Sequence, residues 1–289
     1  MVVPEIMPGE ILWGHFERFL AFNGFDCSSA VKALRQGIEP SNGKYRWPTL
    51  VELLAGKLGM STQQICQHFT TLPFDHAVTD NYQGIRHGDP AMASVLRYKV
   101  KTYAKLGGVI CPDCVVEDEG YWGFGYFRRE HQLPGINHCS KHQTHLLWQT
   151  RSEEIFFPDA NNRALKPKVE NKTHADGGSD KSLFMENYLG IIDHWLMQTS
   201  PIPVRVFKNV INERKPHLDQ EVHCALDAQF FRLTNRAEYV PGHHAAALLA
   251  AMFESAEDAL NAIQEHRIKA DSSGGALPPE RFPKSLITT

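Results

Sequence analysis

Residues 111–142, which read CPDCVVEDEGYWGFGYFRREHQLPGINHCSKH, decide how the rest of the chain is interpreted. They begin with Cys111 and Cys114 on a two-residue spacer and end, after a 24-residue loop, with Cys139 and His142 on the same spacer. Two such turns can place three thiolates and one imidazole around one cation, and structural zinc sites use this kind of ligand set with no position left open. The sequence therefore predicts a structural Zn²⁺ site formed by these four residues.

Three alternatives compete with this interpretation. His138 and His145 lie near the second pair, and only the spacing favours His142 as the fourth ligand. A redox CxxC pair requires a strand–turn–helix context, whereas the Gly-Gly pair at 107–108 and the acidic run at 117–119 favour a knuckle. Disulfides are disfavoured because no secretory signal is recognised and the other three cysteines have no partner spacing.

The loop between the two ligand pairs is rich in aromatic residues. These are Tyr121, Trp122, Phe124, Tyr126 and Phe127, and Arg128 and Arg129 follow them directly. One interpretation is a small core under the metal, which a segment of this size needs. The other is an aromatic and basic surface that binds a partner or nucleic acid. The core interpretation is favoured, and the two arginines are kept as candidate contacts.

Several motifs of this segment resemble one protein family. They are CPDC at 111–114, GYFRR at 125–129, HQLPG at 131–135, and then Cys139, His142 and Leu146. This set resembles the TniQ/TnsD family of transposon target-selection proteins. The N-terminus agrees, because Pro8-Gly9-Glu10 followed by Leu12 and Arg18 is similar to that family's opening helix. The resemblance covers roughly residues 5–150 and is most specific in the zinc-binding segment.

The resemblance implies a non-catalytic adaptor in DNA transposition. Such a protein links a target-recognition complex to a AAA+ regulator and the transposase. In RNA-guided, CRISPR-associated transposons it docks on a Cascade-type guide-RNA effector complex, often as a homodimer. The alternative within the family is a TnsD-like protein that binds the transposon attachment site directly and sequence-specifically. TnsD-like relatives generally run longer and carry additional C-terminal DNA-binding modules.

Charge and motif content bear on these alternatives. The chain has 30 Lys and Arg against 33 Asp and Glu, a formal net charge of −3 and a pI near 6.6. This disfavours a stand-alone DNA clamp, because phosphate neutralisation supplies most non-specific affinity. No P-loop, HExxH or nucleophile-elbow motif occurs, and a zinc enzyme would need an open coordination position, so no enzyme is predicted. No signal peptide or bilayer-spanning apolar run is recognised, so a cytoplasmic protein is expected.

The expected fold is mainly α, built of helix-turn-helix bundles with a small zinc-ribbon-like insert. An opening helix is predicted over 10–23. Arg18 lies off its apolar stripe, and a solvated or salt-bridged arginine is favoured over a contact with a partner. A helix-turn-helix is predicted over 49–69, where Gly59 fits the first C-cap and residues 61–64 form a capping box.

Two segments are candidates for nucleic-acid contact. If the helix-turn-helix bound DNA, Gln63, Gln64 and Gln67 would face the major groove. That helix contains no Lys or Arg, so a structural or protein-binding role is favoured. A further helix is predicted to begin at Asp89 and contains the most basic segment of the chain. Its cationic residues are Arg97, Lys99, Lys101 and Lys105.

The predicted organisation has an N-terminal domain at 1–156, with the zinc-binding segment at 107–148, and a C-terminal helical domain at 182–270. A polar stretch at 157–181 is interpreted as a linker or long loop, and 271–289 as a flexible tail. Most histidines outside the zinc segment are expected at the surface or in caps. A second metal site in the C-terminal half is disfavoured because the spacing of its His and Cys residues fits no standard pattern. Those residues are His223, Cys224, His243 and His244.

Overall fold

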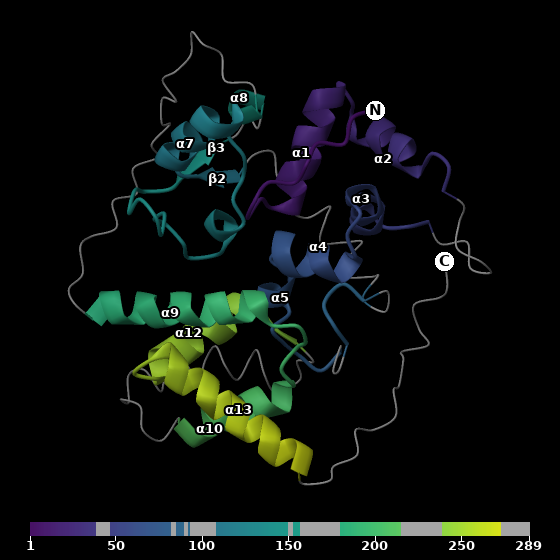
Figure 1. Cartoon of the computed structure of the whole chain (residues 1–289). Coiled ribbons are helices and arrows are strands. Elements are labelled where there is room, and N and C mark those ends of the chain that lie inside the picture. Colours follow the sequence, from purple (N-terminus) through teal and green to yellow (C-terminus); the bar gives the residue numbers. More distant parts are fainter. Residues whose placement is uncertain are drawn as a thin grey trace.

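The computed structural model describes residues 1–38, 47–81, 85–89, 92, 108–149, 153–156, 180–214 and 239–272. These residues form α-helices and two small two-stranded sheets, so the fold is mainly α, as predicted. Figure 1 shows one group of helices from the first part of the chain, with the segment of the four predicted ligands beside it, and a second group from the C-terminal part. None of the described helices combines the length and the apolar character needed to cross a membrane.

The first helical group contains α1 (Leu12–Asn23), α2 (Cys27–Arg35), α3 (Leu50–Leu58) and α4 (Thr62–Phe69). α1 begins two residues later than predicted and ends at Gly24, whose φ of 62° and backbone N–H cap the last turn. The apolar faces of these helices pack into one core. Its largest fully buried side chains include Phe19, Leu34, Leu53, Leu54 and Ile65.

The predicted helix-turn-helix is present as α3 and α4, and both helices begin with a capping box. The Thr49 hydroxyl accepts from the Glu52 N–H, while the Glu52 carboxylate accepts from the Thr49 N–H. Ser61 and Gln64 make the same reciprocal pair at the start of α4. Gly59, with φ of 67°, turns the chain between them. Each N-cap contributes about 1 kcal/mol, which fixes where these short helices begin.

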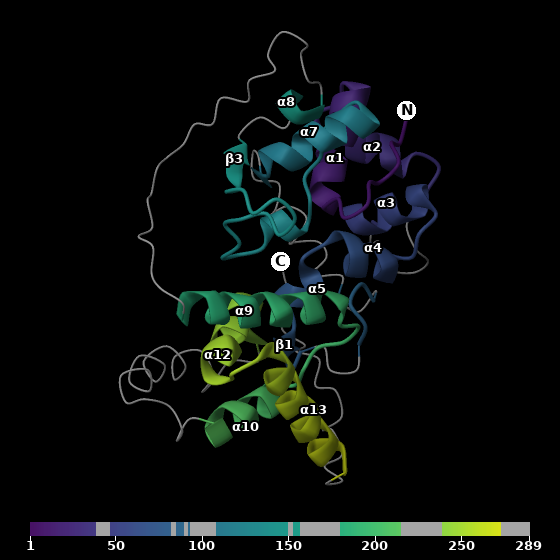
Figure 2. The same ribbon diagram turned by 60° about the vertical axis from the view of Figure 1, so that its left-hand side comes forward.

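The second helical group contains α9 (Asp180–Met197), α10 (Val204–Arg214), α12 (Gly242–Met252) and α13 (Ala256–Ser272). Within the second group, α9 is the helix that faces the first group (Figures 1 and 2). It contacts α4 and α5 (Leu72–Asp75) on one side and α12 and α13 on the other. This helix is therefore the main structural link between the N-terminal helices and the C-terminal ones.

A strand pair also ties the first half of the chain to the second group. β1 (Val78–Thr79) pairs antiparallel with β4 (Tyr239–Val240). Phe74 and Val78 are fully buried in the same cluster as Trp195 of α9. The core of the second group therefore contains side chains from both sides of the predicted linker.

The first residue of α12, Gly242, lies so close to the backbone of α5 that there is no room for a side chain. A Cβ atom built on Gly242 would lie 1.9 Å from the carbonyl oxygen of Phe74. Any larger residue at this position would push α12 away from the backbone of α5.

The segment with the four predicted ligands consists of β2 (Gly108–Ile110), α7 (Pro112–Trp122), the 3-10 helix η2 (Glu130–Gln132), β3 (Leu147–Gln149) and α8 (Glu153–Phe156). β2 and β3 pair antiparallel. An apolar cluster of its own joins this segment to α1. The buried members are Ile11, Trp13, Ile110, Val115, Phe127, Ile155 and Phe156. The ring centroids of Trp13 and Phe127 lie 4.7 Å apart, so the segment packs directly on the opening helix.

Several predictions fall outside the described residues and stay predictions. They are the basic residues Arg97, Lys99, Lys101 and Lys105, nearly all of the linker at 157–181, the tail from 273 onward, and His223 and Cys224.

Candidate metal centre

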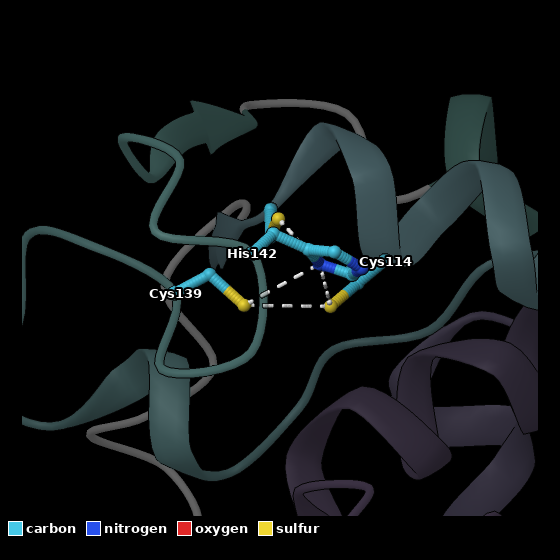
Figure 3. A group of neighbouring side chains, drawn as sticks. Cys114, Cys139 and His142 are labelled. Carbon is cyan, nitrogen blue, oxygen red and sulfur yellow. Dashed lines mark hydrogen bonds between the residues drawn. The ribbon is translucent and has the colours of Figure 1, made fainter.

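The fold brings Cys111 to the same point as Cys114, Cys139 and His142, the three residues labelled in Figure 3. One donor atom from each of the four lies within 4.8 Å of the other three. The His142 Nδ1 lies 3.5, 3.3 and 3.6 Å from the sulfurs of Cys111, Cys114 and Cys139, respectively. The Cys114 and Cys139 sulfurs are 3.6 Å apart. No other group of three or more such donors is found among the residues that the structure describes.

These separations are those of a tetrahedral metal site. With metal–sulfur bonds near 2.3 Å and metal–nitrogen bonds near 2.0 Å, the edges of the tetrahedron are about 3.5 to 3.8 Å long. The three cysteines are buried and the histidine is partly exposed. The cluster can therefore hold a metal ion with protein atoms in all four positions, an arrangement that leaves no place for an activated water.

Two backbone turns hold the ligands. Cys111 is the N-cap of α7 and Cys114 lies in its first turn, so both sulfurs project from the same helix end. In the second turn the Cys139 N–H donates to the Thr144 carbonyl and the Gln143 N–H donates to the Cys139 carbonyl, both over 2.9 Å. Gln143 has φ of 55°, and this left-handed residue lets the chain reverse directly after the second ligand pair.

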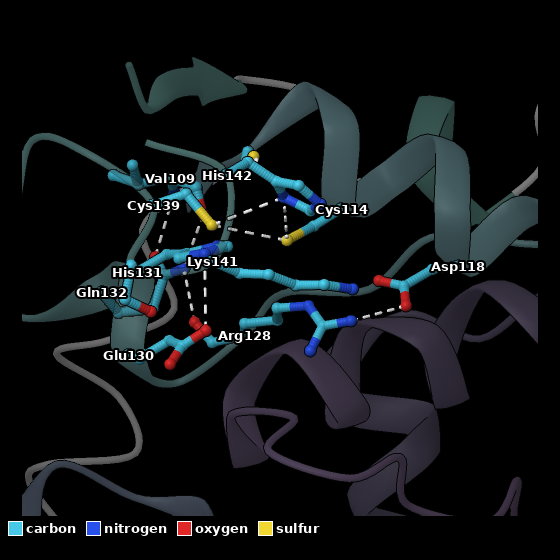
Figure 4. Close-up of polar contacts among 12 residues, drawn as sticks. Val109, Cys114, Asp118, Arg128, Glu130, His131, Gln132, Cys139, Lys141 and His142 are labelled. Carbon is cyan, nitrogen blue, oxygen red and sulfur yellow. Dashed lines mark hydrogen bonds and ion pairs between the residues drawn. The ribbon is translucent and has the colours of Figure 1, made fainter. Parts of the chain in front are cut away.

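Gln132 of η2 fixes the strand that leads into the first ligand. Its amide accepts from the Val109 N–H over 2.9 Å and donates to the Val109 carbonyl over 2.6 Å (Figure 4). The same nitrogen donates to the Arg128 carbonyl over 3.0 Å. One side chain therefore acts as an additional strand partner for β2 and positions Cys111.

Two of the three cysteines need a nearby positive charge to ionise. Burial raises the pKa of the Cys111 and Cys114 thiols, which disfavours their thiolate forms. At Cys139, burial acts to raise the pKa as well, but hydrogen bonds from the backbone N–H groups of His142 and Lys141 outweigh the effect of burial. The pKa of Cys139 is therefore lowered. Metal binding requires thiolates, and a divalent cation supplies the positive charge that stabilises several of them in one buried place.

An acidic residue of α7 orients the histidine. The His142 Nδ1 faces the sulfurs, and its Nε2 lies 3.0 Å from the Glu117 carboxylate. The other Glu117 oxygen pairs with Lys141. The Glu117 hydrogen bond raises the pKa of His142. A carboxylate on the far nitrogen of a ligating histidine fixes the ring orientation and its tautomer, so Glu117 is the outer partner of the site.

The two alternative histidine ligands do not join the cluster. His138 and His145 face each other instead, with their Nε2 atoms 3.2 Å apart. The geometry therefore supports His142, which the sequence could favour only by spacing.

The knuckle expected at the first cysteine pair is wrong. β2, the turn at Cys111 and α7 form a strand–turn–helix unit, and the acidic run at 117–119 lies inside the helix. Helix propensity extends through this run, and Gly123 with φ of 82° ends the helix. The local backbone is thus compatible with a redox pair, and the contacts of Cys139 and His142 with that pair are what indicate a metal site.

Part of the aromatic loop is buried, as the core interpretation predicts, and part of it is exposed, as the surface interpretation predicts. Tyr126 and Phe127 are buried, and the Tyr126 hydroxyl donates to the Pro8 carbonyl over 3.0 Å. Tyr121 and Trp122 are 77% and 41% exposed at the C-terminal end of α7, and their rings meet edge to face. The core prediction is confirmed only for the later part of the loop.

Both candidate arginines of the loop make contacts within the chain. Arg128 donates to Asp118 over 2.6 Å (Figure 4), although burial still raises the pKa of that carboxyl to about 6. Arg129 donates to the Gln67 carbonyl, and the Gln67 amide donates to the Met197 carbonyl over 3.2 Å. These contacts join α4 and α9 to the segment that holds the four ligands, which we call the metal segment. A role of these residues in nucleic-acid or partner contact stays a prediction.

The other two glutamines lie at the start of α4. The exposed Gln64 forms the capping box described above. Gln63 is partly buried, and residue 88 approaches its backbone so closely that a Cβ atom on Gly88 would lie 2.8 Å from the Gln63 Cα. The end of the helix that would enter a major groove is therefore partly covered by the chain itself.

A buried charged cluster at the N-terminus was predicted only in part. Arg18 is 1% exposed and its guanidinium donates to both oxygens of the fully buried Glu10, over 2.7 and 3.0 Å. Burial raises the pKa of Glu10, but hydrogen bonds from His15 and Arg18 and their charges lower it overall. Of the two states expected for Arg18, the salt-bridged one is correct and the solvated one is wrong. The acid eight residues before this arginine was the available signal.

The segment before α1 adds to the metal segment by backbone pairing. The Ile11 N–H donates to the Phe127 carbonyl over 2.9 Å, and the Arg129 N–H donates to the Gly9 carbonyl over 2.8 Å. Glu10 sits between these two bonds, opposite Arg128. The buried pair of Glu10 and Arg18 therefore stands where the opening helix meets the metal segment.

Most histidines outside the zinc segment are expected at the surface or in caps, and two of the described ones are buried instead. His15 is 0% and His87 is 2% exposed. His15 lies three residues after Leu12 and four before Phe19, so the apolar stripe of the opening helix was the available signal for its burial, whereas His87 follows no such pattern.

Comparison with protein families places the first half of the chain. Residues 1–146, about half of the chain, match the family model TniQ, and no curated protein matches. TniQ proteins are associated with transposition and are generally non-catalytic. The match includes all four members of the Cys₃His cluster and α1, which packs against the segment that holds them. The chain belongs to the TniQ family.

Proposed function

We propose that the Cys₃His cluster binds Zn²⁺ and that the ion is structural. Three sulfurs and one imidazole at tetrahedral spacing suit zinc, because soft thiolate ligands select it over calcium and magnesium. When bound, the ion supplies a positive charge and four fixed bonds. Cys111 and Cys114 then hold the start of α7, and Cys139 and His142 hold the turn beside it.

We further propose that the protein is a non-catalytic adaptor in DNA transposition. It would link a Cascade-type guide-RNA effector complex to the AAA+ regulator and the transposase, as a homodimer. The observation that carries this proposal is the TniQ match over residues 1–146. A closed metal site fits a protein whose work is to present surfaces rather than to catalyse a reaction.

The exposed end of α7 is the surface we assign to partner contact. Tyr121 and Trp122 are 77% and 41% exposed at the end of a helix whose start is fixed by the metal cluster. Aromatic side chains in such positions are enriched at protein interfaces, since they bury much area with little loss of rotamer freedom. Acidic residues accompany them on α7, which favours a protein partner over nucleic acid.

Direct recognition of an attachment site by α4 is the alternative. The helix-turn-helix geometry supports it. Three observations count against it: α4 has no Lys or Arg, Gly88 packs against its start, and Gln67 is bonded to α9.

Co-purification tests the adaptor against the DNA-binding protein. Tagged protein is isolated from cells that express the neighbouring guide-RNA complex, with and without nuclease, and the paired variant Tyr121→Ala/Trp122→Ala is compared with wild type. We expect nuclease-resistant recovery of the complex, lost in the paired variant and kept in the control Ile268→Ala, which removes an exposed apolar side chain of α13.

The opposite result has a defined form. Recovery of no complex, together with binding to one DNA sequence that falls by a factor of about 10³ or more between 50 and 200 mM salt, would replace the adaptor with the attachment-site binder.

A further inference from the structure

A pair of histidines lies beside the metal centre and is not part of it. His138 and His145 are both exposed and stand opposite each other in an isolated antiparallel bridge. Their Nε2 atoms are 3.2 Å apart, and their ring centroids are 3.9 Å apart with an angle of 40° between the planes. Cys139, the next residue after His138, is fully buried in the cluster. Because successive side chains of an extended segment point to opposite sides, the histidine pair faces solvent while the cysteine faces the cluster.

The two Nε2 atoms share a hydrogen bond whose direction depends on the tautomers of the rings, and that bond is not linear. An imidazole N–H that pointed straight at the other ring's nitrogen would hold the two centroids roughly 5 Å apart or more. The observed 3.9 Å places the two rings side by side, so the two nitrogen atoms are neighbours and do not point at each other along one line. Two imidazole nitrogens on one metal ion at about 2.0 Å are about 2.8 to 3.3 Å apart, for bond angles between 90° and the tetrahedral value. The separation of 3.2 Å falls within this range.

We propose that His138 and His145 form a second, bidentate site for a divalent transition metal of the kind that imidazole prefers, such as Zn²⁺, Ni²⁺ or Cu²⁺. The cross-strand bridge holds the two Cα atoms. The exposed rings would turn outward from a centroid separation of 3.9 Å to about 4.5 to 5 Å, at which both lone pairs point at one ion. Water fills the remaining positions, so the ion exchanges with solvent. This distinguishes the site from the Cys₃His cluster, which surrounds its ion with protein.

The His243 and His244 pair of α12 provides a matched comparison. Its ring centroids are 4.1 Å apart, close to the 3.9 Å of the first pair. These residues are sequence neighbours on a helix, and neighbours at i and i+1 diverge by about 100° around the axis. They are therefore not expected to chelate an ion, and His244→Ala serves as the control.

Calorimetric titration of the purified, metal-containing protein with Ni²⁺ tests the proposal. We expect one additional equivalent to bind in wild type and in His244→Ala. Binding should weaken at least about tenfold in His138→Ala and in His145→Ala, because one imidazole alone is a monodentate ligand. The content of the original metal is measured before and after the titration, so that replacement of the ion in the Cys₃His cluster is recognised.

A second measurement needs no variant and covers the case in which a substitution disturbs the fold. The ¹⁵N signals of the imidazole nitrogens are followed in wild-type protein while Zn²⁺ is added. Shifts of the Nε2 signals of His138 and His145, with those of His243 and His244 unchanged, support the site. No additional equivalent of Ni²⁺, equal binding in the His138 and His145 variants, or unchanged Nε2 signals of this pair would overturn it.

Discussion

Replacing Arg18 with methionine is expected to destabilise the folded protein by about 3 to 5 kcal/mol, because it leaves a buried charge without its partner. Methionine keeps much of the aliphatic packing and removes the guanidinium. That group donates to both Glu10 oxygens and to the Glu5 carbonyl. Glu10 is fully buried, so its carboxylate would retain only the 2.8 Å bond from the Met7 N–H and the contact with His15.

The size of the effect can be assigned to the charge with a double-mutant cycle. Arg18→Met and Glu10→Gln are made singly and together, and unfolding in urea is followed by circular dichroism at pH 7. The double variant should be more stable than the sum of the single effects predicts, by about 2 kcal/mol, since it leaves no unpaired charge. Arg205→Met, at an exposed position of α10, makes the same substitution and should stay within about 0.5 kcal/mol of wild type.

Two outcomes would refute this reasoning. A loss below about 1 kcal/mol for Arg18→Met would mean that the cluster is hydrated and that the pair does not hold α1 against the metal segment. Strictly additive effects in the cycle would mean that the two residues do not interact energetically.

Three further predictions follow from the same structure. Burial lowers the pKa of His87 from 6.5 to about 4, so the unfolded chain takes up a proton before the folded one does as the pH falls. This contribution to the free energy of unfolding is present above about pH 6.5 and is lost towards pH 4. Between pH 7 and 4, the free energy of unfolding of His87→Leu should therefore fall by about 3 kcal/mol less than that of wild type, as measured by paired urea titrations. Parallel curves of stability against pH would contradict this prediction. Gly242→Ala should destabilise the protein by several kcal/mol because its Cβ meets the α5 backbone. Gly56→Ala, which has open space around it in the interior of α3, should instead stabilise the protein by about 0.5 to 1 kcal/mol. Equal shifts in melting temperature for the two variants would be the contrary result. Cys111→Ala should lower soluble yield and melting temperature steeply, and a variant with normal yield and melting would exclude a structural role for the metal.

The sequence allowed the metal cluster to be predicted because its information is local. Two short spacers fix two turns, and the ligand chemistry that joins them is independent of the rest of the fold. The choice between His138, His142 and His145 was not local, because it depends on which side of the reversal at Gln143 each side chain faces. Spacing favoured His142, and the fold supplied the reason.

Features that depend on contacts between distant segments were not predicted. The Gln132 amide completes β2 only because η2 packs beside that strand, and glutamine carries no signal for such a role. Likewise β1 pairs with a strand about 160 residues later, so no local pattern indicates it. The acidic run at 117–119 is helical where a knuckle is predicted, because α7 begins directly after Cys111 and the helix propensity of its residues carries it through the run.

X-ray absorption spectroscopy of the metal in the protein as purified, combined with its metal content, tests whether the Cys₃His cluster is a closed zinc site. We expect one zinc per chain with about three sulfur neighbours near 2.3 Å and one nitrogen neighbour near 2.0 Å. A protein without stoichiometric metal, or a coordination shell that contains oxygen in place of one of these four ligands, would contradict a closed structural site at Cys111, Cys114, Cys139 and His142.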